Sequence, residues 1–239
     1  DEGKEYGLHG RISNLSAEKI FYDGRWNGED FVFIIQGTVR EVVVLDYNFE
    51  FKRKITTLLS EPKLIVEDTI SNIGHSPAPY MILYHINIGW PVLDENLKVF
   101  IPGSITTPMN NEAKRKKNSH LSFTGPLKDL SYELYLHEFT PDKDGFVTII
   151  LLNPLFDSEN GLGLSIRYLH ANLPYLIQFK KLSKGEYFCS FEPASSFENR
   201  ATQRERKNLR MLEPFETITN LIEFAVLPSN DSINDHIIP

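Results

Sequence analysis

The chain contains a central stretch, Tyr80-Met-Ile-Leu-Tyr-His-Ile-Asn-Ile-Gly-Trp-Pro-Val-Leu-Asp94, that combines a strand pattern with a titratable side chain. The first nine residues of this stretch alternate as in a β-strand, where successive side chains point to opposite faces. One face is apolar, and the other carries Met81, Leu83, His85 and Asn87. Gly89 and Pro91 then interrupt the strand and turn the chain. The pattern predicts an imidazole and an amide on the same face, close to the end of a strand.

The residue type at position 85 leaves two interpretations open. A buried strand gains little from a histidine and an asparagine on one face unless both side chains are hydrogen-bonded. His85 is therefore either a core histidine whose hydrogen bonds are satisfied, or a titratable group placed for chemistry.

The remaining sequence predicts β-structure almost throughout. Further segments are rich in β-branched and aromatic residues and are bounded by turn residues, as strands are. They are residues 31–35, 39–45, 49–59, 63–70, 147–152, 163–169, 175–182, 186–191 and 217–226. Residues 94–126 are expected to be irregular, and only residues 199–209 show a helix-like period. Many short strands and no break in composition favour an all-β fold, a β-sandwich, in a single domain over residues 1–239.

The charge balance excludes one class of partner. The 239 residues carry 25 Lys and Arg against 32 Asp and Glu, a formal net charge of −7. Nucleic acid binding needs a concentrated positive surface, so nucleic acid is not expected as a partner. The one basic cluster, residues 114–117, favours a solvated loop tip. Cys189 is the only cysteine, which excludes an internal disulfide and a cysteine zinc site. We predict no metal and no cofactor.

The sequence also bears on location. It contains no run of about twenty apolar residues, the length that a transmembrane helix needs. No signal peptide is recognisable, so no membrane association and a cytoplasmic location are predicted. The first residue is Asp1 rather than Met, and we expect the sequence to be part of a longer protein.

Three common catalytic motifs are missing. Gly161-Leu-Gly163 lacks the Lys-Ser/Thr of a phosphate-binding loop, and His137-Glu138 has no second histidine at helical spacing. The sequence also has no Gly-x-Ser-x-Gly nucleophile elbow. These observations argue against a P-loop protein, a zincin and an α/β-hydrolase.

Four places remain where polar side chains could carry chemistry. They are His9 with Arg11 around a glycine, His85 with Tyr84 and Asn87, Glu133 with Tyr135 and His137 on one strand face, and Glu192 at the end of an apolar strand. A glycine between a histidine and an arginine lets the backbone present both donors together, although a surface turn is an equal alternative. A strand-end glutamate is more often solvent-facing or salt-bridged than functional.

Five segments resemble, in the same order, those of a known family. They are Gly7-Leu-His-Gly-Arg-Ile-Ser-Asn14, Leu83-Tyr-His-Ile-Asn-Ile-Gly89 with Pro91-Val-Leu-Asp-Glu95, Leu173-Pro174, Phe191-Glu-Pro-Ala194 and Leu212-Glu-Pro-Phe-Glu216. The chain is similar to the DUF4432 family, an aldose 1-epimerase-related group of the galactose mutarotase-like superfamily. The resemblance implies a large twisted β-sandwich, the supersandwich, with a sugar cleft on a concave sheet. Family members carry further strands before the His9 segment, so an N-terminal portion is expected to be missing here.

The resemblance also implies a pair of catalytic residues. In mutarotases of this superfamily a strand histidine acts as general acid and a late glutamate as general base, and these match His85 and Glu192. Interconversion of α and β anomers removes the proton of the anomeric hydroxyl and protonates the ring oxygen. The ring then opens, the C1–C2 bond rotates and the ring closes on the other face, so an acid and a base suffice without a cofactor.

Further residues are implied as substrate-binding groups. They are His9, Arg11, Asn87, Trp90, Glu133, His137 and Arg200. Trp90 could stack on a sugar or plug the core. The chain departs from the family at Ser195-Ser196 and Asn199-Arg200, where relatives often carry Asn and a Gly-Arg pair, and at Phe215, where they carry Gly. These departures affect the identity of the substrate more than the fold.

Three functions stay open at this point. The first is an aldose 1-epimerase acting on a small-molecule sugar or sugar derivative. The second is a carbohydrate-binding protein on the same scaffold without turnover. The third is an isomerase or epimerase acting at another carbon. A homodimer is compatible with each, and two arginines in the cleft would favour an anionic sugar.

Overall fold

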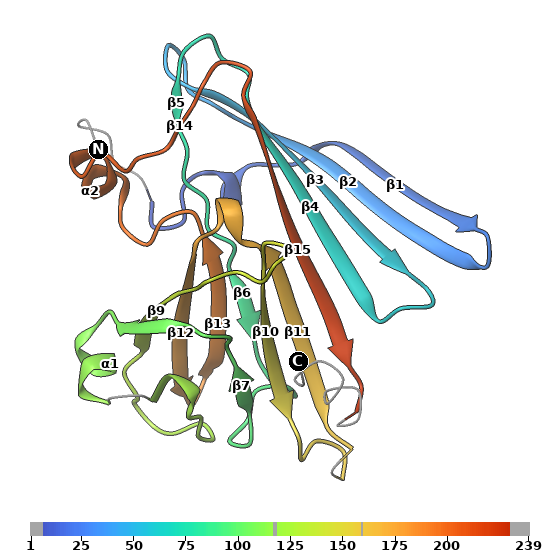
Figure 1. The fold of residues 1–239 in the computed structure, drawn as a ribbon, viewed down its shortest axis with the longest axis vertical. Coiled ribbons are helices and arrows are strands. Elements are labelled where there is room, and N and C mark those ends of the chain that lie inside the picture. The colour runs from blue at the N-terminus through green and yellow to red at the C-terminus, as the bar shows by residue number, and fades with distance from the viewer. Residues whose placement is uncertain (1–6, 117–118, 159, 230–239) are drawn as a thin grey trace. The chain divides into compact units, whose positions relative to one another are not determined.

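We describe the protein from a computed structural model, which describes residues 7–116, 119–158 and 160–229. The chain folds as two compact units (Figure 1). The first comprises Asp1–Ile82 and Glu198–Ile222, and the second comprises Leu83–Phe197 and Glu223–Pro239.

The first unit is built on long antiparallel strands. In order along the sheet these are β1 (Glu18–Asn27), β2 (Asp30–Val42), β3 (Asn48–Leu58), β4 (Lys63–Asn72) and the first half of β15 (Thr217–Leu227). The short strands β5 (Ala78–Pro79) and β14 (Met211–Leu212) pair with each other, and η1 (Ile12–Asn14) and α2 (Arg200–Glu205) complete the unit. Its core is the cluster of Ile70, Tyr80, Leu212 and Ile218.

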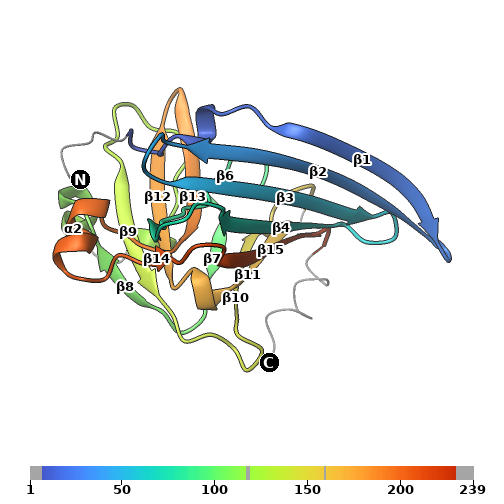
Figure 2. The same ribbon diagram turned by 90° about the horizontal axis from the view of Figure 1, so that it is seen from above.

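The second unit holds two sheets. The five-stranded sheet has the order β6 (Ile86–Ile88), β13 (Glu186–Ala194), β12 (Tyr175–Ser183), β9 (Glu133–Glu138) and β8 (Ile105–Pro108). In the other sheet, β11 (Leu162–Leu169) lies between β10 (Phe146–Asn153) and the second half of β15, and β7 (Lys98–Phe100) pairs with β10. Short helical turns are α1 (Asn111–Arg115), η2 (Ser119–Leu121) and η3 (His170–Asn172). Figures 1 and 2 show β9, β12 and β13 side by side.

The core of the second unit follows from the apolar alternation of its strands. Each of the three central strands of the five-stranded sheet contributes some fully buried side chains. Leu176, Cys189 and Phe191 are among them. In β10, residues 149–153 are buried on both faces, as their continuous apolar run indicates. These strands hold the site described below on a rigid base.

The central stretch from Tyr80 to Asp94 keeps its predicted alternation. Tyr84 and Ile88 are buried, whereas His85 and Asn87 on the other face are exposed. The ladder itself is shorter than predicted, since β6 covers only Ile86–Ile88, preceded by a single bridge from Leu83 to Ala194. The predicted break is confirmed: the chain turns after β6, and the Leu93 amide donates to the Gly89 carbonyl at 2.9 Å.

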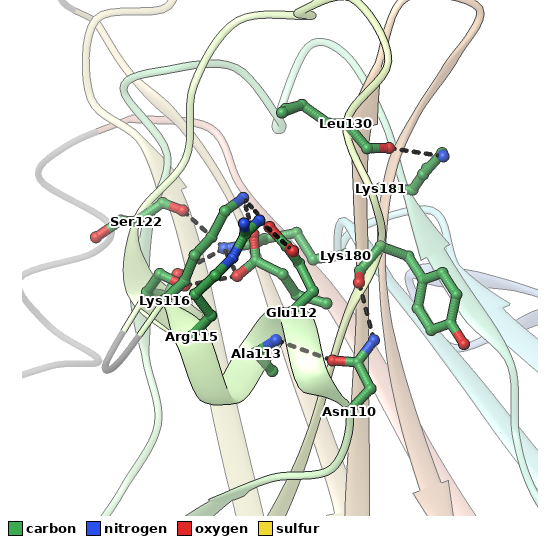
Figure 3. A network of polar contacts seen from close by, with 12 residues as sticks. Asn110, Glu112, Ala113, Arg115, Lys116, Ser122, Leu130, Lys180 and Lys181 are labelled. Atoms are coloured by element: carbon green, nitrogen blue, oxygen red, sulfur yellow. Dashed lines mark hydrogen bonds and ion pairs between the residues drawn. The ribbon is translucent and has the colours of Figure 1, made fainter.

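Three local predictions are wrong. Residues 94–126 are not irregular throughout, because β7, β8, α1 and η2 lie within this range. Residues 31–35 and 39–45 were predicted as separate strands, but Gln36 and Gly37 between them pair with β3 and continue one strand, β2. The basic cluster is not a loop tip: Lys114 and Arg115 lie in α1, which Asn110 caps by accepting a hydrogen bond from the Ala113 amide at 3.0 Å (Figure 3). Lys117 lies outside the described residues.

Candidate active site

Strand register places His85 beside Glu192. β6 pairs antiparallel with β13 through Ile86 with Phe191 and Asn87 with Ser190. In an antiparallel pair, the residue before Ile86 lies opposite the residue after Phe191. These two residues are His85 and Glu192, the predicted catalytic pair. Because side chains alternate along a strand, Asn87 and Ser190 lie on the same face two residues away.

The contact between the two residues is direct. His85 Nε2 lies 3.3 Å from Glu192 Oε1, and the exposed fractions of the two side chains are 35% and 8%. Ser190, which is fully buried, donates a hydrogen bond from Oγ to the same carboxylate oxygen. The carboxylate is thereby fixed at the floor of the sheet face, while the imidazole reaches solvent. This arrangement can take a proton from, and give a proton to, a bound molecule.

Ser190 is a residue that the sequence interpretation missed. Its signal was available, since it precedes Glu192 by two residues and must share its face in a strand. A serine in an apolar strand is unremarkable by itself. Only the hydrogen bond to Glu192 distinguishes it.

Trp90 and Asn87 lie near His85 along the chain. Asn87 is exposed on the face that carries His85. Trp90 follows β6 and is 75% exposed, with its ring edge-on to Phe156 at 6.2 Å between centroids. The alternative of a core plug for Trp90 is therefore wrong.

Glu133 and His137 are not brought together with His85 and Glu192. In β12, Lys180 pairs with both Glu133 and Cys189, so these three share one face of the sheet. Glu192 instead pairs with Ile177, an odd-numbered residue on the opposite face. Glu133 and His137 therefore point to the other side of the sheet.

Glu133 belongs to a buried polar network, of which Lys116 and Lys180 are labelled in Figure 3. It accepts from Lys180 Nζ at 2.9 Å, Lys116 Nζ at 3.0 Å, Ser119 Oγ at 2.5 Å and Tyr135 OH at 2.6 Å. Burial alone would raise the pKa of Glu133, but hydrogen bonds from Ser119, Tyr135 and Lys180 lower that pKa to about 2. The buried carboxylate is therefore ionised, and it holds Lys116 and Ser119 against β9 and β12.

His137 is a satisfied core histidine. It is fully buried, with Nδ1 at 3.0 Å from Thr106 Oγ1 and Nε2 at 3.0 Å from Gln178 Oε1. Burial is the main cause that lowers the pKa of His137 to about 4, so the ring is neutral at pH 7. Both ring nitrogens are occupied by protein partners.

His9, Arg11 and Arg200 are described within the first unit. Gly10 between the first two has a φ of +66°, the left-handed conformation that the sequence suggested. Arg11 Nη1 donates to Tyr47 OH at 3.1 Å, and Tyr47 OH donates to Glu41 Oε1 at 2.7 Å. Arg200 is the first residue of α2, which Asn199 caps through the Thr202 amide. The second unit brings together His85, Asn87 and Glu192.

Two kinds of feature are absent from the described part of the chain. None of its helices is long and apolar enough to cross a lipid bilayer. In residues 7–116, 119–158 and 160–229, no three His, Cys, Asp or Glu side chains are grouped so that they could hold a metal ion.

Comparison with solved structures identifies the fold. A protein of Klebsiella pneumoniae with the provisional name aldose 1-epimerase matches with a TM-score of 0.90 and 21% identity, over 98% of this chain and 61% of that chain. A galactose mutarotase related enzyme of Lactobacillus acidophilus matches with a TM-score of 0.63 and 12% identity, over 95% and 76% of the two chains. A galactose mutarotase-like protein of Clostridium acetobutylicum matches with a TM-score of 0.61 and 15% identity, over 92% and 68%.

These similarities confirm the predicted all-β fold of the galactose mutarotase-like class. This chain spans only 61% of the length of the Klebsiella structure. Residues 1–226 match the domain of unknown function DUF4432, and the chain therefore belongs to that family, as its five segments indicated. No curated protein matches the sequence.

Proposed function

We propose that this protein interconverts the α and β anomers of a sugar, with His85 as general acid and Glu192 as general base. The observation that carries the proposal is the 3.3 Å contact between His85 Nε2 and Glu192 Oε1 on a sheet face that reaches solvent. The similarity of the fold to proteins named for this activity supports it.

The chemistry suits two neighbouring groups. The hydroxyl that loses a proton and the ring oxygen that gains one are both bonded to C1 of the sugar. An acid and a base in contact with each other can therefore reach both atoms of one substrate. Glu192 takes the hydroxyl proton as the C1–O5 bond breaks, and His85 protonates O5, which gives the open-chain aldehyde. After rotation about C1–C2, the two residues reverse their roles and the ring closes.

The surrounding residues have supporting roles in this proposal. Ser190 holds the carboxylate oxygen that faces His85, so the base is oriented before the sugar binds. Asn87 and Trp90 bind the sugar hydroxyls and the apolar sugar face in the second unit. Sugar binding by His9, Arg11 and Arg200, which lie in the first unit, stays a prediction. The cytoplasmic location and a homodimer stay predictions.

A second candidate function is sugar binding without turnover. The observation that favours it is the same contact, because an imidazole and a carboxylate that satisfy each other form a stable structural pair. In that case the sheet face would bind a sugar through Asn87 and Trp90 alone.

The two candidates are separated by exchange NMR of free aldoses. Magnetisation transfer between the α and β anomeric protons reports the rate at which the ring opens and closes. We expect one or more aldoses to exchange faster with the protein, and His85→Ala or Glu192→Gln to lower that rate at least about 100-fold.

Glu186→Gln provides a matched control. Glu186 lies on the same strand, β13, and its side chain is 66% exposed. Replacing it with glutamine should leave the rate of anomeric exchange unchanged. Unchanged exchange in the His85 and Glu192 variants would refute the assignment of acid and base. Sugar binding without faster exchange would select the second candidate.

A further inference from the structure

An aromatic ladder lies on the same sheet face as the acid–base pair. Tyr132 stacks on Phe179 with ring centroids 5.0 Å apart, and Phe179 stacks on Phe188 at 5.5 Å, with both interplanar angles 14°. In the register of β12 and β13, Phe179 pairs with Ser190 and the next pair on that face is Ile177 with Glu192. The ladder therefore continues the face that carries Glu192, two residues along the strands.

The ladder ends at the exposed ring of Tyr132. Phe179 has a ring on each side, so neither of its faces is available to a ligand. Tyr132 is 46% exposed, precedes β9 and forms the end of the stack. An aromatic face that is half exposed is an apolar platform, and it suits the apolar C–H face of a sugar ring.

A cavity continues from Tyr132. Its volume is about 620 Å³, and its polar lining includes Asn111, Glu112, Asp129, Ser131 and Lys181 in addition to Tyr132. Lys181 Nζ is held by the Leu130 carbonyl at 2.8 Å (Figure 3) and by Glu186 at 3.4 Å. An aromatic ring combined with amide, carboxylate and hydroxyl groups is the lining expected for a polyhydroxylated ligand.

Sheet geometry gives the span from the acid–base pair to this cavity. Tyr132 is separated from Glu192 by two strand spacings of about 4.8 Å and by four residues of about 3.4 Å each, which together give about 17 Å. A single sugar ring at Glu192 does not reach Tyr132. A ligand that occupies both places must extend well beyond one ring.

We propose that Tyr132 and this cavity form a second sugar subsite, and that the substrate is a reducing oligosaccharide. This inference rests on the proposed function, since the reducing sugar is placed at His85 and Glu192. Anomer interconversion requires a free anomeric hydroxyl, so the extension leaves the reducing sugar through another carbon. The non-reducing end then stacks on Tyr132 and binds the polar groups of the cavity.

The test compares oligosaccharides with their monosaccharides. The probes are the β-1,4-linked and α-1,4-linked glucose trimers and tetramers and the β-1,4-linked galactose trimer and tetramer, together with glucose and galactose. Dissociation constants come from calorimetry, and anomeric exchange rates come from NMR. We expect at least one oligosaccharide to bind about tenfold more tightly than its monosaccharide, which corresponds to about 1.4 kcal/mol.

Variants at the subsite assign this preference. Tyr132→Ala should weaken binding of the preferred oligosaccharide about fivefold to tenfold and leave the affinity for the monosaccharide within about twofold. Tyr132→Phe keeps the ring and is the matched control, with affinities close to those of the unmodified protein. Asn111→Ala changes an exposed cavity residue outside the ladder and should also weaken only the oligosaccharide.

The outcomes separate this inference from the proposed function. If the protein prefers an oligosaccharide and Tyr132→Ala loses that preference, the subsite is supported. If the unmodified protein at the same time does not accelerate anomeric exchange, turnover is refuted. Accelerated exchange without any oligosaccharide preference keeps turnover and overturns the subsite. An equal loss of affinity for monosaccharide and oligosaccharide in Tyr132→Ala also overturns the subsite.

Discussion

Protonation of His137 should destabilise the folded protein at mildly acidic pH. Burial is the main cause that lowers the pKa of this ring from an ordinary value of 6.5 to about 4. Between these values the unfolded chain binds a proton that the folded chain does not bind, so the free energy of unfolding falls as the pH falls through this window. Linkage with these two values gives a loss of about 2 kcal/mol between pH 7 and pH 5.

Urea unfolding of the unmodified protein and of His137→Gln tests this value. Glutamine is uncharged at every pH and keeps one polar end of the side chain. Between pH 7 and pH 5, the free energy of unfolding of His137→Gln should therefore fall by about 2 kcal/mol less than that of the unmodified protein. Comparison of the two proteins removes contributions common to both, such as that of His120, whose pKa is also lowered by burial. Equal pH dependence in both proteins would refute the reasoning, because the ring would then titrate normally in the folded state.

Three further predictions concern polar groups that the structure places in defined roles. Ser190→Ala should lower the rate of anomeric exchange about tenfold with little effect on sugar affinity, measured by NMR and calorimetry, because it removes the group that orients Glu192. Glu133→Gln should cost about 3 kcal/mol in urea unfolding, because it leaves the buried Lys180 ammonium uncompensated, and a second change, Lys180→Met, should restore part of that loss. Asn72→Ala should cost about 2 kcal/mol by thermal or urea unfolding, since the Asn72 amide donates to the carbonyls of Ser76 and Leu212 and its oxygen accepts from the Gly74 amide. A loss below about 0.5 kcal/mol at either buried position would contradict the assigned hydrogen bonds.

The strands were predictable from sequence where apolar alternation is uninterrupted. Residues 63–70 were predicted and form most of β4, and the last strand was predicted at 217–226 and found at Thr217–Leu227. β1 was missed, because Asp23, Gly24 and Arg25 interrupt its pattern and its residues are almost all exposed. Strand pairing with β2, which no local pattern reveals, forms this strand.

The candidate site could be predicted only in part, for a reason of register. The alternation within one strand correctly placed His85 with Asn87, and Glu133 with His137. Which face of one strand meets which face of the next depends on the pairing between strands, and this sets Glu133 and His137 on the side opposite Glu192. Sequence pattern alone contains no information on that choice.

The dependence on pairing makes the acid–base pair sensitive to changes in chain length. One residue inserted within β13 before Cys189 would exchange the two faces for the residues that follow, bringing Cys189 and Phe191 beside His85 and sending Ser190 and Glu192 into the core. An insertion in the turn between β12 and β13, where Gly185 has a φ of +86° and open space around it, would leave the pairing intact. The turn between β12 and β13 can therefore gain or lose residues. A single insertion within β6 or β13, by contrast, shifts the register and separates His85 from Glu192.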